Sequence, residues 1–288
     1  MGYALISGTD LIIWLQSFSS DFLDTFFKYV TLLGDEEFYL LFLPLVLWCI
    51  DKRVGIKLAF LSLLSTYANT FLKDVFAIPR PCDPRIRQMV DFEGYSFPSQ
   101  HAQGTTALWG YLASQYRSLA MGVLAVVIPI LVSLSRLYLG VHYPQDVIGG
   151  MAIGVFLILA FNWVVSLADK MYVPPAARVV GALLLPAGLL ALHPTTAAAR
   201  AMGGLLGMGV GSLLEGWFVR FEARGPWWKQ LLKLAIGLAI SFALWAGLKA
   251  VLPEAIIFRL IRYGVVGLWV TFLAPWFFVR TSLAKREG

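Results

Sequence analysis

The chain has 288 residues, of which 59% are hydrophobic and 14% charged, and its formal net charge is +6. A mean hydropathy of +0.74 and ten tryptophans exclude an ordinary soluble domain, whose surface could not carry so many apolar side chains. The sequence therefore predicts an all-α, polytopic membrane helix bundle. The positive charge is explained by Lys and Arg in the loops between spans, so it requires no nucleic-acid partner.

The first stretch, residues 9–34, interrupts its apolar residues with polar ones. Gln16, Asp21, Asp24 and Lys28 recur at helical spacing, and we expect an amphipathic helix that lies in the membrane interface. The predicted organisation is an interfacial N-terminal segment, a core helix bundle that carries the candidate site described below, and C-terminal transmembrane helices of unassigned role, at residues 1–36, 37–193 and 194–288.

About nine segments are predicted to span the membrane, since a span needs about 20 apolar residues. They are residues 37–51, 55–75, 99–116, 118–136, 145–168, 178–193, 201–219, 231–251 and 257–279. With this topology, one side collects 13 Lys and Arg residues and the other 10, three of which belong to the candidate site below. Because cytoplasmic loops are enriched in Lys and Arg, we expect a cytosolic C-terminus and an external N-terminus.

The second predicted span carries a polar stripe that ends in two cations. Thr66, Asn69 and Lys73 share one helix face, which we expect to face protein or a cavity. Pro79 should end this helix, so that Arg80 is presented in a stiff turn near Lys73. A snorkelling lysine followed by a basic loop end is the alternative interpretation.

A polar loop at residues 82–98 precedes the third span. Its charged residues fit a lid or a rim that selects substrate, and they also fit an ordinary surface loop. They are Asp83, Arg85, Arg87, Asp91 and Glu93.

The start of the third span has the features of an anion site. Pro98 suits the first helical position, and Ser99, Gln100 and His101 follow in the first turn. Unpaired amides at a helix N-terminus attract an anion, and Ser99 can add a hydroxyl donor. His101, when protonated, can give a proton to a departing alkoxide. A capping serine beside an interfacial histidine would produce the same pattern.

Residues 135–146 place ionisable groups between two apolar segments, where such groups are costly. Asp146 follows His142 by four residues and can orient its imidazole and stabilise the charged form. Arg136 adds a planar fork of donors that suits a phosphate oxyanion. We therefore expect His142 to attack phosphorus, with a water-facing surface loop as the alternative.

The predicted topology places all of these groups at helix ends on one face of the membrane. This convergence predicts one site rather than unrelated polar residues. The residues concerned are Lys73, Arg80, Ser99, His101, Arg136, His142 and Asp146.

Three ordered motifs resemble the signature of the type 2 phosphatidic acid phosphatase superfamily. Lys-x6-Arg-Pro is met at residues 73–81, and Ser-Arg-x5-His-x3-Asp is met at residues 135–146. Pro-Ser-Gly-His is met at residues 98–101 with Gln100 in place of glycine. This departure affects only a turn that requires glycine, since a backbone amide remains at Gln100.

The resemblance implies a role for each matching residue. His142 would form a phosphohistidine with Asp146 as its partner, and His101 would protonate the leaving group and then activate water. A phosphate cradle would consist of Lys73, Arg80, Ser99, the backbone amide of Gln100 and Arg136. No metal and no other cofactor is implied.

We therefore expect a metal-independent, vanadate-sensitive membrane phosphatase that hydrolyses lipid phosphate monoesters or diphosphates at the extracytoplasmic face. Its partners would be the phosphorylated lipid substrate and the surrounding membrane lipids. Three alternatives stay open: a phosphatase of a soluble sugar phosphate resembling glucose-6-phosphatase, a lipid phosphotransferase, and a non-catalytic lipid transporter.

Overall fold

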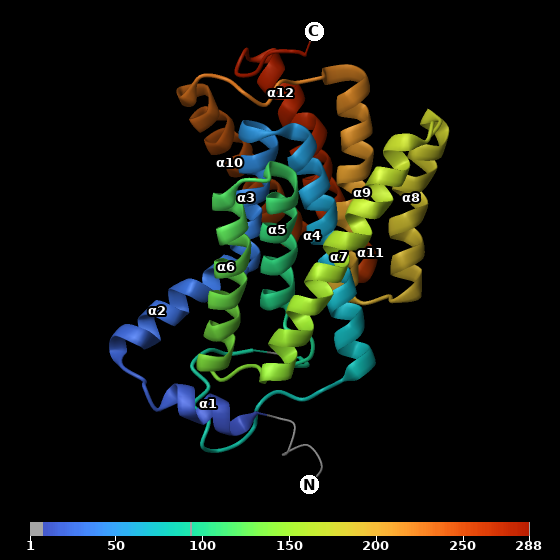
Figure 1. Ribbon diagram of the computed structural model, residues 1–288. Coiled ribbons are helices and arrows are strands. Elements are labelled where there is room, and N and C mark those ends of the chain that lie inside the picture. The colour runs from blue at the N-terminus through green and yellow to red at the C-terminus, as the bar shows by residue number, and fades with distance from the viewer. Residues whose placement is uncertain (1–7, 93, 288) are drawn as a thin grey trace. The chain divides into compact units, whose positions relative to one another are not determined.

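The computed structural model describes residues 8–92 and 94–287, and these are arranged as helices joined by loops (Figure 1). The expectations for residues 1–7 and for Glu93 lie outside the described residues. The α-helices are α1 (Thr9–Gln16), α2 (Asp21–Thr31), α3 (Glu36–Leu45), α4 (Lys52–Phe76), α5 (Gln100–Tyr116), α6 (Leu119–Tyr138), α7 (Pro144–Lys170), α8 (Pro175–Leu192), α9 (Thr196–Leu214), α10 (Trp227–Val251), α11 (Ile256–Leu268) and α12 (Ala274–Arg280). A 3₁₀ turn, η1, covers Leu32–Gly34, and π-helical turns cover Val46–Ile50, Glu215–Val219 and Trp269–Leu273.

The predicted all-α class is confirmed for the described part of the chain. Six helices are long and apolar enough to cross a membrane. They are Leu119–Tyr138, Pro144–Lys170, Pro175–Leu192, Thr196–Val219, Trp227–Val251 and Ile256–Arg280. The other three predicted spans, over α3, α4 and α5, are also helical.

The N-terminal stretch forms two helices instead of the single helix that its polar spacing predicts. α1 ends at Gln16, and α2 begins after Ser20, whose hydroxyl accepts a hydrogen bond from the Leu23 amide at 3.3 Å. A serine in this position caps a helix because it satisfies an amide that has no partner inside the helix. The helical pattern is correct on both sides of the break, but the pattern did not reveal the break.

Proline sets the end of α4 and the approach to α5. α4 ends at Phe76, two residues before Ile78, the residue whose helical conformation is disfavoured by Pro79. Pro98, predicted at the first helical position, instead lies just outside α5, because Ser99 is the N-cap and the helix begins at Gln100.

The chain divides into two compact units. Unit 1 comprises Met1–Tyr39 and Ala68–Trp163, and unit 2 comprises Leu40–Tyr67 and Val164–Gly288. α4 and α7 each contribute residues to both units. All of the site residues predicted from the sequence fall in unit 1.

Within unit 1, α5 packs along α6, and α1 and α2 pack against α6. α7 approaches α5 closely at Gly150 and Gly154, where a Cβ would collide with the backbone oxygens of Ser99 and Gln103. The absence of a side chain at these two positions allows the start of α7 to lie against the start of α5. This packing joins the third motif to the second.

Within unit 2, α9 and α11 form the most extensive helix pair. Gly203, Gly207 and Gly211 recur every four residues on α9, and a Cβ at Gly207 would collide with the backbone of Gly264 on α11. Small residues at this spacing let two membrane helices approach closely, so that van der Waals contacts and weak polar contacts can hold them together.

Candidate active site

The buried centre of the site is a histidine and carboxylate pair at the α6–α7 junction. His142 is 2% exposed and Asp146 is fully buried, and His142 Nδ1 lies 3.4 Å from Asp146 Oδ2. Asp146 is in the first turn of α7, where the helix dipole favours a carboxylate. Its Oδ2 also accepts a hydrogen bond from the Tyr143 amide at 2.7 Å. The pair is therefore held by a local turn as well as by the helix.

Ser96, which the sequence interpretation missed, is a third member of this centre. Its hydroxyl donates to Asp146 Oδ2 and lies 3.3 Å from His142 Nδ1. Its amide donates to the carbonyl of Ile78 at 2.7 Å, so the loop after α4 fixes its position. No motif marks Ser96, because its role depends on a contact across 46 residues of sequence.

Arg80 approaches the opposite side of the His142 ring. Its Nη1 lies 3.4 Å from His142 Nε2 and donates to the Val141 carbonyl at 2.8 Å, while its Nε donates to the Gly94 carbonyl at 3.1 Å. Burial lowers the pKa of Arg80, although a guanidinium keeps its charge near neutral pH. One nitrogen of His142 thus faces a carboxylate and the other faces a cation.

Burial is also the main cause that lowers the pKa of His142 well below 6.5, and the charges of Arg136, Arg80 and Lys73 add to the effect. The neutral imidazole is therefore the resting form. A neutral imidazole beside a carboxylate at Nδ1 favours the tautomer with its proton on Nδ1, which leaves a lone pair on Nε2.

Arg136 is fully buried at the end of α6, and some of its hydrogen-bond donors have no partner among the described residues. Its Nη1 donates to Thr31 Oγ1 at 2.7 Å, whereas its Nε and Nη2 find no hydrogen-bond partner among the described residues. Buried guanidinium donors without partners are costly, and an oxyanion would satisfy them. This is the feature of the site that most directly indicates an anionic ligand.

Phe92 links the two arginines. Its ring centroid lies 4.2 Å from Arg136 Cζ and 5.1 Å from Arg80 Cζ, and 6.1 Å from the centroid of the His101 ring. Three residues that are 56, 21 and 35 positions apart in the sequence therefore surround one side chain of the loop before α5. No motif or spacing in the sequence singles out Phe92.

Lys73 occupies the last turn of α4 and is half-buried. Its Nζ has no hydrogen bond or ion pair among the described residues, and it lies within electrostatic range of Arg80, Arg136 and Asp146. On the same helix, Asn69 is fully buried and donates to the Pro98 carbonyl and to Gln103 Oε1. Asn69, in the middle of the predicted polar stripe, thus faces protein.

The second motif supplies the start of α5. Ser99 caps the helix through its hydroxyl, and its amide donates to the Asp146 carbonyl at 2.9 Å. Gln100 is the first helical residue, so its amide is among those without a partner inside the helix. The Gln100 side chain is exposed, and the residue that replaces glycine here does not fill the site.

His101 is buried in the first turn of α5 and pairs with an acid that the sequence analysis did not single out. Its Nε2 lies 2.7 Å from Asp35 Oδ1, in the link between η1 and α3. The two residues are 66 positions apart, so no local pattern could have indicated the pair.

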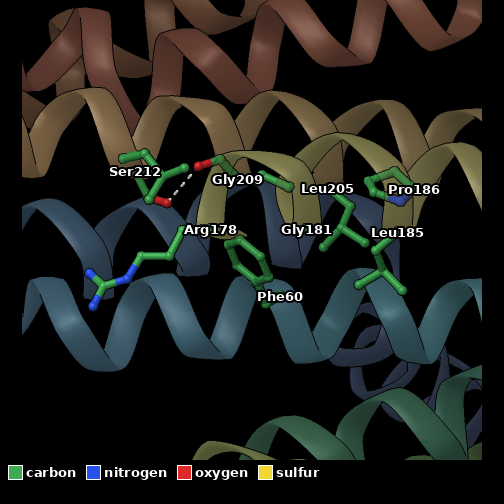
Figure 2. A pocket seen from close by; sticks show the side chains of 10 residues that line it. Phe60, Arg178, Gly181, Leu185, Pro186, Leu205, Gly209 and Ser212 are labelled. Carbon is green, nitrogen blue, oxygen red and sulfur yellow. Dashed lines mark hydrogen bonds between the residues drawn. The ribbon is translucent and has the colours of Figure 1, made fainter. Parts of the chain in front are cut away.

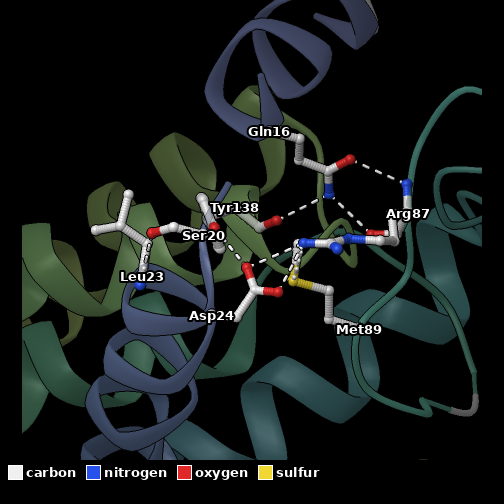
Figure 3. A network of polar contacts seen from close by, with 7 residues as sticks. All are labelled: Gln16, Ser20, Leu23, Asp24, Arg87, Met89 and Tyr138. Atoms are coloured by element: carbon white, nitrogen blue, oxygen red, sulfur yellow. Dashed lines mark hydrogen bonds and ion pairs between the residues drawn. The ribbon is translucent and has the colours of Figure 1, made fainter. Parts of the chain in front are cut away.

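The loop at residues 82–98 is tied to the N-terminal helices (Figure 3). Arg87 binds Asp24 Oδ2 at 2.8 Å, and its amide donates to Gln16 Oε1 at 2.9 Å. Gln16 Nε2 donates to the carbonyls of Arg87 and Tyr138, and the Tyr138 hydroxyl donates to Asp24. Gln16 and Asp24, expected on the polar face of an interfacial helix, therefore bind the loop that carries Ser96 and Phe92.

A cavity of about 310 Å³ lies elsewhere, in unit 2 (Figure 2). Its walls are mainly apolar side chains of α4, α8 and α9, with Arg178 and Ser212 among the lining residues. The lining residues include no nucleophile paired with a base, so this cavity does not compete with the histidine site as a catalytic centre.

Comparison with known proteins gives two separate matches to family models. Residues 55–169 match the PAP2 superfamily, and residues 199–286 match the PAP2 superfamily phosphatase transmembrane extension. The first range contains all three motifs and therefore every residue predicted for the site. The second range covers α9 to α12, for which the sequence suggested no chemistry.

Curated relatives and a solved structure are consistent with these matches. Lipid phosphate phosphatase delta of Arabidopsis thaliana is 31% identical over 54% of this chain and 41% of its own length. The probable sphingosine-1-phosphate phosphatase of Dictyostelium discoideum is 30% identical over 72% of this chain and 56% of its own, and sphingosine-1-phosphate phosphatase 2 of Homo sapiens is 38% identical over 46% and 35%. The chain thus spans about half or less of the length of these relatives. The crystal structure of Aquifex aeolicus LpxE, 24% identical, shares the fold over 54% of this chain and 94% of that chain with a TM-score of 0.50.

Proposed function

Because the chain belongs to the PAP2 superfamily and carries its three motifs in one unit, we propose that it is a membrane phosphatase that hydrolyses lipid phosphates through a phosphohistidine on His142. The observation that carries this proposal is the buried His142 itself. Its Nδ1 faces Asp146 and Ser96, while its Nε2 faces Arg80, one of the cations that would hold a phosphate.

In the first step, the Nε2 lone pair of His142 attacks phosphorus and the bond from phosphorus to the leaving-group oxygen breaks. Positive charge develops on the imidazole, and the Asp146 carboxylate stabilises it. The leaving oxygen takes a proton from His101. The products of this step are the free alcohol and a phosphohistidine.

In the second step, His101 has become a base and takes a proton from water as the water oxygen attacks phosphorus. The bond between phosphorus and Nε2 breaks, which returns His142 to its neutral form and releases inorganic phosphate. His101 thus acts as acid and base in turn, as microscopic reversibility requires when one group serves both halves of a reaction.

The cradle for the transferred phosphoryl group would be Arg80, Arg136 and Lys73, with the amides and hydroxyl at the start of α5. Three cations around one centre match the negative charge of a phosphate, and preorganised donors in a buried site are more effective than the same donors in water. These cations supply the charge stabilisation that a metal ion provides in other phosphatases. We therefore expect activity to resist EDTA.

The proposed substrate is a lipid phosphate monoester or diphosphate. The names of the relatives concern lipid phosphates and sphingosine-1-phosphate, and at least six helices of this chain are apolar enough to lie in a membrane. We further propose that the chain crosses the membrane nine times, with the site on the extracytoplasmic face and the C-terminus in the cytosol. A site at helix ends would let the acyl chain of the substrate enter from the bilayer.

The test uses the full chain purified in detergent. Phosphate release is measured from dioctanoyl phosphatidate, sphingosine-1-phosphate and glucose-6-phosphate, with and without EDTA and vanadate. We expect EDTA-resistant, vanadate-sensitive release from the lipid substrates, and loss of this activity in His142→Ala. His193→Ala is the matched control, since His193 lies in unit 2, outside the three motifs.

Retention of full activity by His142→Ala would overturn the mechanism. Preference for glucose-6-phosphate would move the assignment to a soluble sugar phosphate. Transfer of phosphate to an added alcohol in place of water would identify a phosphotransferase. Lipid binding without phosphate release would identify a non-catalytic lipid protein.

A further inference from the structure

The short segment from Thr31 to Asp35, which joins α2 through η1 to the loop before α3, contacts two motif residues directly. Asp35 Oδ1 lies 2.7 Å from His101 Nε2, and Thr31 Oγ1 accepts a hydrogen bond from Arg136 Nη1 at 2.7 Å. This segment precedes residues 55–169, the part of the chain that matches the family model. The motifs alone therefore do not supply the whole environment of the site.

The fit between this segment and His101 is close. A Cβ placed on Gly34 would collide with the His101 ring, so the imidazole packs directly against the backbone at this glycine. The Asp35 side chain is 28% exposed and the His101 side chain 11% exposed, which places the pair at the edge of the buried centre. Backbone contact on one side and a carboxylate at Nε2 together restrict rotation of the ring.

The pairing with Asp35 gives the two ring nitrogens of His101 different roles. A proton on Nε2 is donated to the Asp35 carboxylate, and this bond determines which tautomer the neutral ring adopts. Nδ1 then carries the lone pair in the neutral ring and a second proton in the charged ring. No described residue donates to Nδ1 or accepts from it, so this nitrogen is available to a reacting group.

We propose that Asp35 is a positioning residue for His101, which holds the ring through Nε2 so that Nδ1 delivers the proton to the leaving-group oxygen. This inference rests on the proposed phosphatase function and deepens it. It makes the N-terminal segment, in addition to the three motifs, necessary for efficient protonation of an alkoxide. Thr31 would act in parallel by holding one Nη of Arg136 and leaving its other donors for the phosphate.

The role can be tested with two substrates that differ in their need for a proton. Dioctanoyl phosphatidate expels an alkoxide, which must be protonated, whereas p-nitrophenyl phosphate expels a phenolate that leaves without a proton. General acid catalysis contributes about 10²- to 10⁴-fold. We expect Asp35→Asn to lower kcat/KM for the alkyl ester by about 30-fold or more and kcat/KM for the aryl ester by less than about threefold. This ratio reports formation of the phosphohistidine, and it excludes the later step with water, which both substrates share.

Two further variants control for charge and for folding. Glu37→Gln removes an exposed carboxylate two residues away and should leave both rates unchanged. Asp35→Glu keeps the carboxylate and should recover part of the alkyl-ester rate lost in Asp35→Asn. Equal melting temperatures of Asp35→Asn and the unaltered protein would establish that the variant is folded.

An equal loss of both rates in Asp35→Asn would assign Asp35 a structural role and overturn the proposal, as would unchanged rates for both substrates. Failure of the proposed function would look different. In that case the unaltered protein would release no phosphate from either substrate, and the positioning role would be overturned together with the function.

Discussion

Replacing Asp146 with asparagine should remove the negative charge beside His142 while leaving the side chain in place. Asp146 Oδ2 accepts hydrogen bonds from Ser96 Oγ and the Tyr143 amide, and an amide oxygen can take over both. Asp146 Oδ1 has no hydrogen-bond partner among the described residues, so an amide nitrogen can occupy its position without breaking a contact. The fold of the site should therefore survive this substitution.

The expected loss of rate follows from the distance between the two side chains. His142 Nδ1 and Asp146 Oδ2 are 3.4 Å apart. Two unit charges at that separation interact by about 5 kcal/mol at an effective dielectric constant of about 20. Only part of a unit charge has developed on the imidazole in the transition state, so a loss of about 4 kcal/mol is expected. This corresponds to a fall in kcat of about 10³-fold.

The assay is phosphate release from saturating dioctanoyl phosphatidate in detergent, with the melting temperature measured on the same samples. KM should change by less than about threefold, since the carboxylate acts on the nucleophile and does not contact the substrate. A variant that keeps more than about a tenth of the unaltered kcat would refute the assignment of Asp146 as the partner of a nucleophilic His142.

Three other substitutions test the neighbours of this pair. Because the charge of Arg80 helps to lower the pKa of His142, Arg80→Gln should raise this pKa, so that the acid limb of the pH–rate profile begins at a higher pH than in the unaltered protein; an unmoved limb would contradict this. Arg136→Lys should lower kcat/KM by about 10²-fold, because an ammonium cannot replace the buried planar fork, and near-normal kinetics would contradict the role in the cradle. Ser96→Ala should lower kcat about tenfold with little change in KM, because one hydrogen bond to Asp146 is lost; a raised KM with an unchanged kcat in steady-state kinetics would contradict this.

The sequence predicted the parts of the fold that depend on local chemistry. Proline after α4 ends that helix within two residues of the expected position, and the apolar segments are helical as predicted. The break between α1 and α2 was missed, although three of the four residues at 17–20 are serines, which favour caps and turns, and Ser20 caps α2. Pro98 was predicted at the first helical position of α5, and this was wrong, because Ser99 is the N-cap and the helix begins at Gln100.

The motifs predicted which residues would carry chemistry, and they did so because spacing within a motif fixes short-range geometry. His142 and Asp146 are four residues apart at the start of α7, so their pairing could be predicted from the sequence. The partners that complete the site could not be predicted from spacing. Ser96, Thr31 and Asp35 reach their targets across 46, 105 and 66 residues, and only the packing of α2, η1 and α7 against α5 and α6 brings them together.

The N-terminal helices show how the same residues can support two interpretations. Polar residues at helical spacing among apolar ones indicate a helix at a boundary between two environments, and the sequence alone suggested water and lipid. In the structure part of this polar side binds protein, since Gln16 and Asp24 bind Arg87 and Tyr138 (Figure 3), whereas Asp21 and Lys28 are exposed. The segment that follows them ends at Asp35 beside His101. Anchoring α1 and α2 to the loop therefore also fixes the position of the acid that orients a proposed catalytic histidine, and this connects an N-terminal segment without any motif to the chemistry of the site.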